Sequence, residues 1–94
     1  MKDLKEYIRI KLAAHPKRAI SDPAGSPAGV LIPLFEKNGE AHVLLTLRTN
    51  TVASHKGQVS FPGGGSEVGD SDIRQTALRE TYEEVGIEPA QVEI

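Results

Sequence analysis

The chain has 94 residues, no cysteine, 38% hydrophobic and 26% charged residues, and a formal net charge of -2. This length suffices for one small domain, and the composition is typical of a globular chain. The absence of cysteine excludes disulfides and thiol chemistry. No apolar run is long enough to span a bilayer. The sequence also lacks the basic patch with interspersed aromatic residues that is typical of nucleic-acid-binding proteins. We therefore expect a cytoplasmic protein, or an organellar one whose transit peptide is not represented, with neither nucleic-acid nor membrane partners.

The first predicted element is an amphipathic helix that ends before Pro16. Its apolar residues recur at helical spacing and are Leu4, Tyr7, Ile8 and Leu12. We expect this helix to pack on the outside of the domain. Residues 21–29 are rich in Pro, Gly and Ser and predict a loop. We therefore divide the chain into an N-terminal helix and loop, residues 1–28, and a second part, residues 29–94.

Two apolar runs, 29–35 and 41–47, flank the dipeptide Asn38-Gly39. This pattern predicts a β-hairpin, because Asn and Gly tolerate the left-handed backbone of a tight turn. Pro33 cannot donate to a sheet ladder, so we expect its strand at an edge or a bulge.

Residues 57–61 predict a short strand that runs into the three glycines 63–65, which predict a flexible turn with exposed backbone groups. A helix follows and ends at Gly86, which can adopt the left-handed C-cap conformation. Beyond Pro89, residues 92–94 look like the opening of another strand. The apolar arc predicted to pack this helix on a sheet consists of Ala77, Leu78, Thr81, Tyr82 and Val85.

The start of the same helix is acidic. Asp70 or Ser71 can accept a hydrogen bond from the first free backbone N–H groups, and Asp72 suits the positive end of the helix dipole. Farther along, Glu80 and Glu84 lie one helical turn apart, with Glu83 close to the same edge.

Three carboxylates this close repel one another unless a cation neutralises them, and hard oxygen ligands suit Mg²⁺ or Mn²⁺. An isolated Glu-Glu pair is more often a solvated acidic face, but the preceding glycines favour a corner shared by a metal and a phosphate. The charge distribution agrees with this interpretation: residues 1–66 hold nine Lys/Arg and five Asp/Glu, whereas residues 67–88 hold two and seven.

The segment from Gly65 to Ile87 resembles the signature of the Nudix hydrolases, which reads Gly, five residues, Glu, seven residues, then Arg-Glu-apolar-x-Glu-Glu-x-Gly-apolar. The matching later positions are Arg79, Glu80, Glu83, Glu84, Gly86 and Ile87. The first Glu is replaced by Ser71. In the family that Glu commonly pairs with the arginine, so either Asp70 or Asp72 replaces it, or Ser71 simply caps the helix.

A second resemblance narrows the family. The sequences LLTLR at 44–48 and HKGQVSFPGG at 55–64 are similar to a motif of the Nudix branch that hydrolyses coenzyme A and its thioesters, with Thr49 replacing the usual Ser. The resemblance implies an α/β/α sandwich with a mixed sheet. Residues 29–94 would form only the N-terminal half of it, with the Nudix box at about 65–87. We expect these 94 residues alone to be unstable, or to belong to a longer protein.

The resemblance also implies a reaction, in which the diphosphate bond of coenzyme A or acyl-coenzyme A is hydrolysed to 3′-phosphoadenosine 5′-phosphate and (acyl-)4′-phosphopantetheine. It implies Mg²⁺ or Mn²⁺ held by Glu80 and Glu84, with Glu83 assisting. Glu83, Glu80 and Arg79 are the implied catalytic residues, and a backbone carbonyl of the glycine turn could complete the metal coordination. The expected substrate contacts are Arg48, His55, Lys56, Gln58, Gly63 and Gly64.

Three hypotheses stay open, and the first is the coenzyme A diphosphatase. The substrate could be another nucleoside diphosphate, or the chain could be a Nudix-like binding module without turnover. For either enzyme hypothesis, the expected binding partner is a small-molecule nucleotide diphosphate, the substrate. The chain could also form a homodimer.

Overall fold

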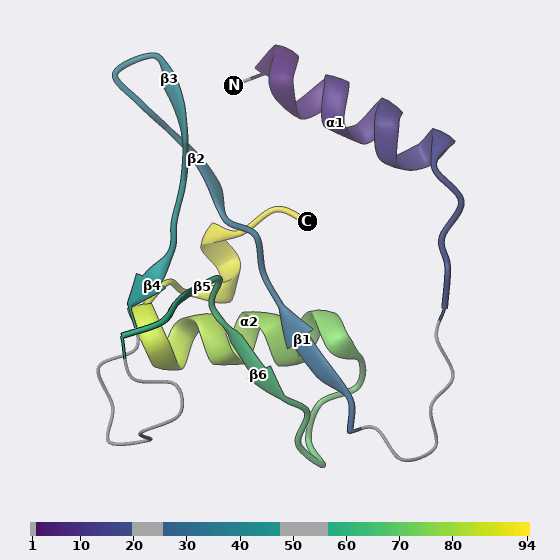
Figure 1. Cartoon of the computed structure of the whole chain (residues 1–94), viewed down its shortest axis with the longest axis vertical. Helices are drawn as coiled ribbons and strands as arrows, with labels where there is room; N and C mark the ends of the chain where they lie inside the picture. Colours follow the sequence, from purple (N-terminus) through teal and green to yellow (C-terminus); the bar gives the residue numbers. More distant parts are fainter. Residues whose placement is uncertain (1, 20–25, 48–56) are drawn as a thin grey trace.

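The computed structural model describes residues 2–19, 26–47 and 57–94 (Figure 1). Its elements in chain order are α1 (Lys2–Ala14), β1 (Ala28–Val30), β2 (Leu34–Lys37), β3 (Glu40–Val43), β4 (Thr46–Leu47), β5 (Val59–Ser60), β6 (Gly63–Gly65), α2 (Ile73–Val85) and the 3₁₀ helix η2 (Pro89–Gln91). The strands form three antiparallel pairs, β1 with β6, β2 with β3 and β4 with β5. The α/β class is confirmed, and no parallel pair occurs within the described ranges.

Helix α2 packs directly on the β1–β6 pair (Figure 1). The approach is close because glycines face the helix: a Cβ atom on Gly29 would lie 2.4 Å from the carbonyl oxygen of Ile73. Thr76, Ala77 and Thr81 of α2 are buried at this contact. Two members of the predicted apolar arc, Ala77 and Thr81, thus face the sheet as expected.

The predicted turn at residues 63–65 is wrong, because these glycines form strand β6. Gly64 pairs with Gly29 and Gly63 with Val30. Three glycines in a row suggest a turn when backbone freedom alone is considered. Here the absence of side chains serves close packing instead, since a Cβ on Gly63 would lie 2.4 Å from the carbonyl oxygen of Gly29.

The predicted hairpin is confirmed. Asn38 and Gly39 both have positive φ, 54° and 77°, and join β2 to β3 in the manner of a type I′ turn. The predicted strand over 29–35 divides into β1 and β2 at Pro33, whose carbonyl oxygen accepts a hydrogen bond from the N–H of Leu44. The proline therefore ends one strand pairing and starts another.

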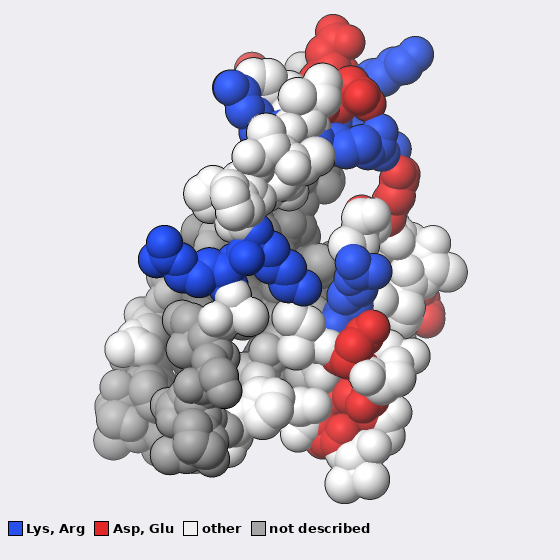
Figure 2. Space-filling model, turned by 90° about the vertical axis from the view of Figure 1, so that its right-hand side faces the viewer, with Lys and Arg blue, Asp and Glu red and all other residues white. Residues whose placement is uncertain are grey.

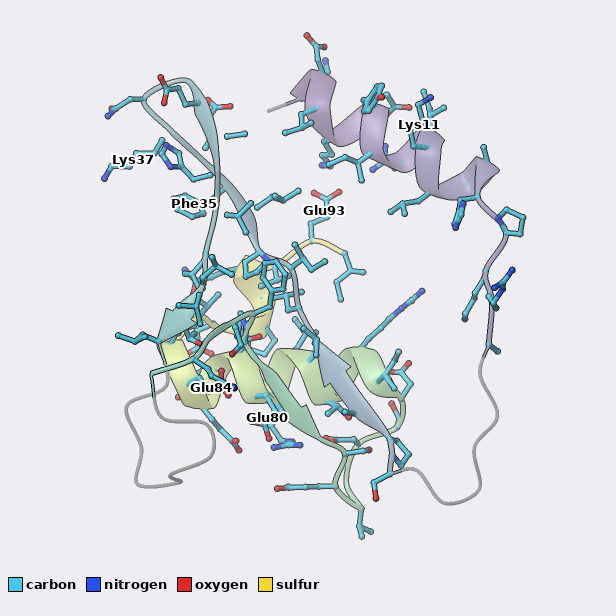
Figure 3. The ribbon with its side chains drawn as sticks, viewed as in Figure 1. Lys11, Phe35, Lys37, Glu80, Glu84 and Glu93 are labelled. Carbon is cyan, nitrogen blue, oxygen red and sulfur yellow. The ribbon has the colours of Figure 1, made fainter. Side chains whose placement is uncertain are left out.

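Helix α1 is confirmed up to Ala14 and contains no buried residue. It meets the C-terminal segment through Glu93, whose carboxylate points toward α1 in Figure 3 and lies 2.6 Å from the ammonium of Lys5. Residues 92–94 form no strand and follow η2 as irregular chain, so that prediction is wrong. No described helix is long and apolar enough to cross a membrane.

A cavity of about 1030 Å³ separates α1 from β2 and the C-terminal segment. Apolar side chains line it on both sides, among them Leu4, Ile8, Leu12, Leu31, Phe35, Leu44, Ile87 and Val92.

Candidate active site

Helix α2 begins at an aspartate cap. The Asp72 carboxylate accepts a hydrogen bond from the N–H of Gln75 at 3.0 Å, and the Gln75 side chain in turn accepts one from the N–H of Ser71 at 3.0 Å. The cap is therefore Asp72 rather than Asp70 or Ser71, which corrects the prediction. At the other end Gly86 has φ 76° and donates to the carbonyl of Tyr82 at 2.9 Å, as predicted for a left-handed C-cap.

The Asp70 carboxylate lies beneath the first turn of α2 and is only 6% exposed. Arg79 donates to it twice, from Nε at 3.2 Å and from Nη2 at 3.0 Å. The hydroxyl of Thr76 donates at 2.8 Å and the backbone N–H of Glu67 at 2.9 Å. Hydrogen bonding from Arg79, and then from Glu67, holds the pKa of Asp70 well below its usual range.

Asp70 thus takes the place of the missing signature glutamate as the partner of Arg79. It precedes Arg79 by nine positions, one more than the signature allows. The loop absorbs the extra residue because Asp70 and Glu67 close a tight turn, with the N–H of Asp70 donating to the carbonyl of Glu67 at 3.0 Å. An acidic residue beside the expected position was the only sequence signal for this partner.

Arg79 connects the loop to the glutamates of α2. Its Nη2 donates to the carbonyl oxygen of Gly65 at 2.9 Å, and its Nη1 donates to Glu80 at 2.9 Å and to both oxygens of Glu83 at 3.3 Å. Hydrogen bonding to Asp70 raises the pKa of Arg79 further above the ordinary arginine value, so Arg79 remains a cation. We expected a backbone carbonyl at Gly64 or Gly65 to complete the metal coordination, and here the Gly65 carbonyl accepts a hydrogen bond from Arg79.

The three glutamates differ in their surroundings. Glu80 packs against strand β6, since a Cβ atom on Gly64 would lie 2.6 Å from the carboxyl carbon of Glu80, and its side chain is 19% exposed. Glu83 is 52% exposed, and Glu84 is exposed and has no ion pair with any residue that the structure describes. Figure 3 shows Glu80 and Glu84 on successive turns of α2.

The donor chemistry of this set fits a hard divalent cation, since every donor is a carboxylate oxygen. Within the described ranges, however, no three His, Cys, Asp or Glu side chains come together as a metal-binding group. The guanidinium of Arg79 lies against an oxygen of Glu80 and both oxygens of Glu83.

The expected substrate contacts are only partly placed. Arg48, His55 and Lys56 lie outside the described residues. Gln58 is exposed just before β5, and Gly63 and Gly64 lie within β6.

On the face drawn in Figure 2, basic and acidic side chains are mixed at the top and lie in separate areas farther down. Lys and Arg form a band across its middle, and several Asp and Glu form a group below and to the right.

Comparison with known proteins identifies the family. The family model described as NUDIX domain matches residues 25–94. The chain is 43% identical over 91 residues to Nudix hydrolase 3 of Caenorhabditis elegans. The aligned region covers 97% of this chain and 38% of that protein. It is 49% identical over 78 residues to the mitochondrial coenzyme A diphosphatase NUDT8 of Mus musculus, covering 82% of this chain and 36% of the relative.

A third relative is the peroxisomal coenzyme A diphosphatase NUDT7 of Mus musculus, 43% identical over 65 residues, which covers 69% of this chain and 28% of the relative. The chain therefore spans well under half the length of these three proteins. With a matching family model over most of its length and a glutamate-bearing helix held against a glycine strand, the chain belongs to the NUDIX domain family.

Proposed function

We propose that this protein hydrolyses the diphosphate bond of coenzyme A or acyl-coenzyme A in a metal-dependent reaction. The observation that carries the proposal is the placement of Glu80 against Gly64, with Arg79 joining that glutamate to Gly65 at the end of β6. This places carboxylates beside the end of the HKGQVSFPGG segment, the motif associated with coenzyme A substrates. Two of the similar relatives are named coenzyme A diphosphatases.

In this proposal Glu80 and Glu84, assisted by Glu83, would hold Mg²⁺ or Mn²⁺. The bound ion would neutralise the diphosphate and make water a better nucleophile. Arg79 would balance the charges of Glu80 and Glu83 through its Nη1 group before the ion binds, and it stays charged because Asp70 holds it. Glu83 and Glu80 are the candidate acceptors of the proton that the attacking water loses.

Substrate contacts are proposed for the segment before α2. Arg48 offers a forked donor suited to phosphate, and His55, Lys56 and Gln58 add further donors. Gly63 and Gly64 would keep the backbone of β6 free of side chains next to the substrate.

The direct test is to incubate the full-length protein with coenzyme A and Mn²⁺ and to separate the products. We expect 3′-phosphoadenosine 5′-phosphate and 4′-phosphopantetheine in equal amounts. Turnover of other nucleoside diphosphates with no turnover of coenzyme A would favour the second candidate, a Nudix hydrolase of different specificity. The C. elegans relative aligns with most of this chain and is named only as a Nudix hydrolase, without a substrate, which supports the second candidate.

The metal assignment is tested by Glu84→Gln, which retains size and removes the charge. We expect loss of turnover by a factor of about 100 or more, as for removal of an electrostatic catalytic group, with an unchanged circular dichroism spectrum because Glu84 is exposed. Glu40→Gln in the hairpin removes the same charge far from the site and is the matched control. Full activity in Glu84→Gln would remove this residue from the site, and absence of turnover in every assay would favour a binding module.

The compartment and the oligomeric state are also proposals. We keep the cytoplasm as the expected location, although the similar relatives include proteins named mitochondrial and peroxisomal. Imaging of the full-length protein with a C-terminal and, separately, an N-terminal fluorescent tag tests this. Sedimentation of the purified protein tests the homodimer.

A further inference from the structure

Arg79 occupies the carboxylates that the proposed function assigns to a metal. Its Nη1 lies 2.9 Å from a carboxylate oxygen of Glu80 and 3.3 Å from both oxygens of Glu83. An arginine N–H and a divalent ion bind the same lone pairs of a carboxylate oxygen. In this arrangement the two cations therefore compete for one oxygen of Glu80 and for both oxygens of Glu83.

The two sides of the guanidinium are held very differently. Nε and Nη2 donate to the Asp70 carboxylate, which is 6% exposed and also receives the hydroxyl of Thr76, and Nη2 donates in addition to the carbonyl of Gly65. Nη1 contacts Glu80 through one oxygen at 2.9 Å and Glu83 at 3.3 Å; these side chains are 19% and 52% exposed. Hydrogen bonds to a nearly buried, multiply bonded carboxylate are harder to exchange than contacts with a solvated one.

We propose that Arg79 is a built-in counter-cation for Glu80 and Glu83, and that a divalent ion takes its place there by releasing Nη1 while Asp70 retains Nε and Nη2. This inference rests on the metal assignment of the proposed function. It explains how α2 carries adjacent glutamates without strong repulsion in the absence of metal, and why no metal-binding group of three side chains is formed among the described residues.

Another arginine on the same helix provides the comparison. Arg74 is exposed and has no ion pair with Glu80 or Glu83. A change at Arg74 therefore alters the net charge of α2 by the same amount without touching the contact. Any difference between the two positions reports the contact rather than the general field of the protein.

The first test follows arginine side-chain N–H signals by NMR in the full-length wild-type protein during titration with Mg²⁺. Arg79→Lys and Arg74→Lys assign the two signals. We expect the Nη protons of Arg79 to exchange faster with water once Mg²⁺ binds, while its Nε–H signal stays protected and the Arg74 signals do not move. Unchanged Arg79 signals at saturating Mg²⁺ would overturn the inference and leave the proposed function standing.

The second test measures Mn²⁺ affinity directly, from the free-ion signal in electron paramagnetic resonance. Removing a unit charge next to a divalent ion at the protein surface is expected to tighten binding about tenfold, so Arg79→Gln should bind Mn²⁺ about tenfold more tightly than wild type. Arg74→Gln, exposed and more distant, should differ by less than about twofold.

The outcomes separate the two proposals. Weaker Mn²⁺ binding in Arg79→Gln would mean that the arginine assembles the ligands instead of competing for them, which overturns the inference alone. If the wild-type protein binds neither Mn²⁺ nor Mg²⁺, the proposed function fails and the inference fails with it. If Arg79→Gln does not fold, the wild-type Mg²⁺ titration decides the question by itself.

Discussion

Asp70 shows how one residue can preserve a contact when the sequence departs from a signature. The family pattern calls for a glutamate where this chain has Ser71, and the neighbouring aspartate turns inward to meet Arg79 through two hydrogen bonds. An aspartate is one methylene shorter than a glutamate, and the turn between Glu67 and Asp70 brings it within reach. Asp70 is thereby committed to Arg79, and Asp72 is left to cap the helix.

The Asp70 contact makes stability sensitive to acid. Because its pKa is lowered in the folded state, the charged form contributes stability above the ordinary aspartate pKa of about 3.9, and this contribution is lost as the pH falls toward the folded-state pKa. We expect the free energy of unfolding of the full-length protein to exceed that of Asp70→Asn most at neutral pH. The difference should shrink as the pH falls below about 4.

Urea unfolding of both proteins across this pH range measures the difference. Asp3→Asn, in an exposed position of α1, is the control and should follow wild type. A gap between Asp70→Asn and wild type that is constant with pH would show that the Asp70 charge is not involved.

A second residue-scale prediction distinguishes the cap from its neighbour. Asp72→Ala removes the acceptor of the Gln75 N–H and should lower the free energy of unfolding by about 1 kcal/mol. Ser71→Ala should have an effect below about 0.5 kcal/mol, because only the backbone N–H of Ser71 is used. Equal effects of the two substitutions, measured by urea unfolding, would contradict the assignment of the cap.

At the scale of elements, the packing of β1, β6 and α2 on one another depends on glycine at three positions. Gly29 and Gly63 allow backbone atoms to approach, whereas Gly64 makes room for the carboxylate of Glu80. The same strand pair thus supports the packing of the helix and the position of one acidic side chain. A substitution at each position should therefore have a different consequence.

We expect Gly29→Ala to destabilise the protein by about 1–3 kcal/mol or more, because the added methyl would meet backbone atoms of Ile73 and Ala77, which cannot move independently. Gly64→Ala should instead displace the Glu80 carboxylate, which lies at the end of a flexible side chain. It should therefore lower turnover far more than stability. Gly65→Ala is the control for fold, since a Cβ there meets no atom within 4 Å.

Thermal unfolding and turnover of the three variants together test whether Gly29 supports stability and Gly64 supports turnover. This division of roles would be wrong if Gly64→Ala unfolded as readily as Gly29→Ala, or if it kept full activity and wild-type Mn²⁺ affinity.

At the scale of the whole molecule, little apolar surface is buried. Ala77 is the one buried hydrophobic residue in the described ranges apart from proline and glycine, and the other fully buried side chains include the threonines Thr76 and Thr81. Many large apolar side chains remain exposed, among them Tyr7, Leu12, Ile32, Leu47, Val59 and Ile73. The apolar walls of the cavity beside α1 also remain apart. Such exposure is unusual for a stable monomer.

We therefore expect the 94-residue chain by itself to lack a sharp thermal transition and to bind an apolar dye strongly. Circular dichroism melting and dye fluorescence measure this. A well-folded globular domain of similar size, measured under the same conditions, is the control and should melt cooperatively with low dye binding. A cooperative transition with weak dye binding in the 94-residue chain would show that the apolar walls close on each other in solution.

Local features were predictable from sequence because each depends on interactions within a few residues. The Asn38-Gly39 turn needs positive φ at two consecutive positions, α1 follows its apolar spacing, and the left-handed end of α2 requires Gly86. The family signature likewise marked Arg79, and in the structure it contacts two of the signature glutamates, as a local motif on one helix allows.

The sequence by itself thus determined the helices, the hairpin, the helix end and the family, since these depend on neighbours along the chain. Only the tertiary structure decided that Gly63–Gly65 form a strand, that Asp70 rather than Ser71 or Asp72 meets Arg79, and that residues 92–94 do not pair. These outcomes depend on which segments, distant in sequence, come into contact. A run of glycines can form a turn or a closely packed strand, and an aspartate can cap a helix or form an ion pair. Which of these occurs depends on the segment that the fold brings beside it.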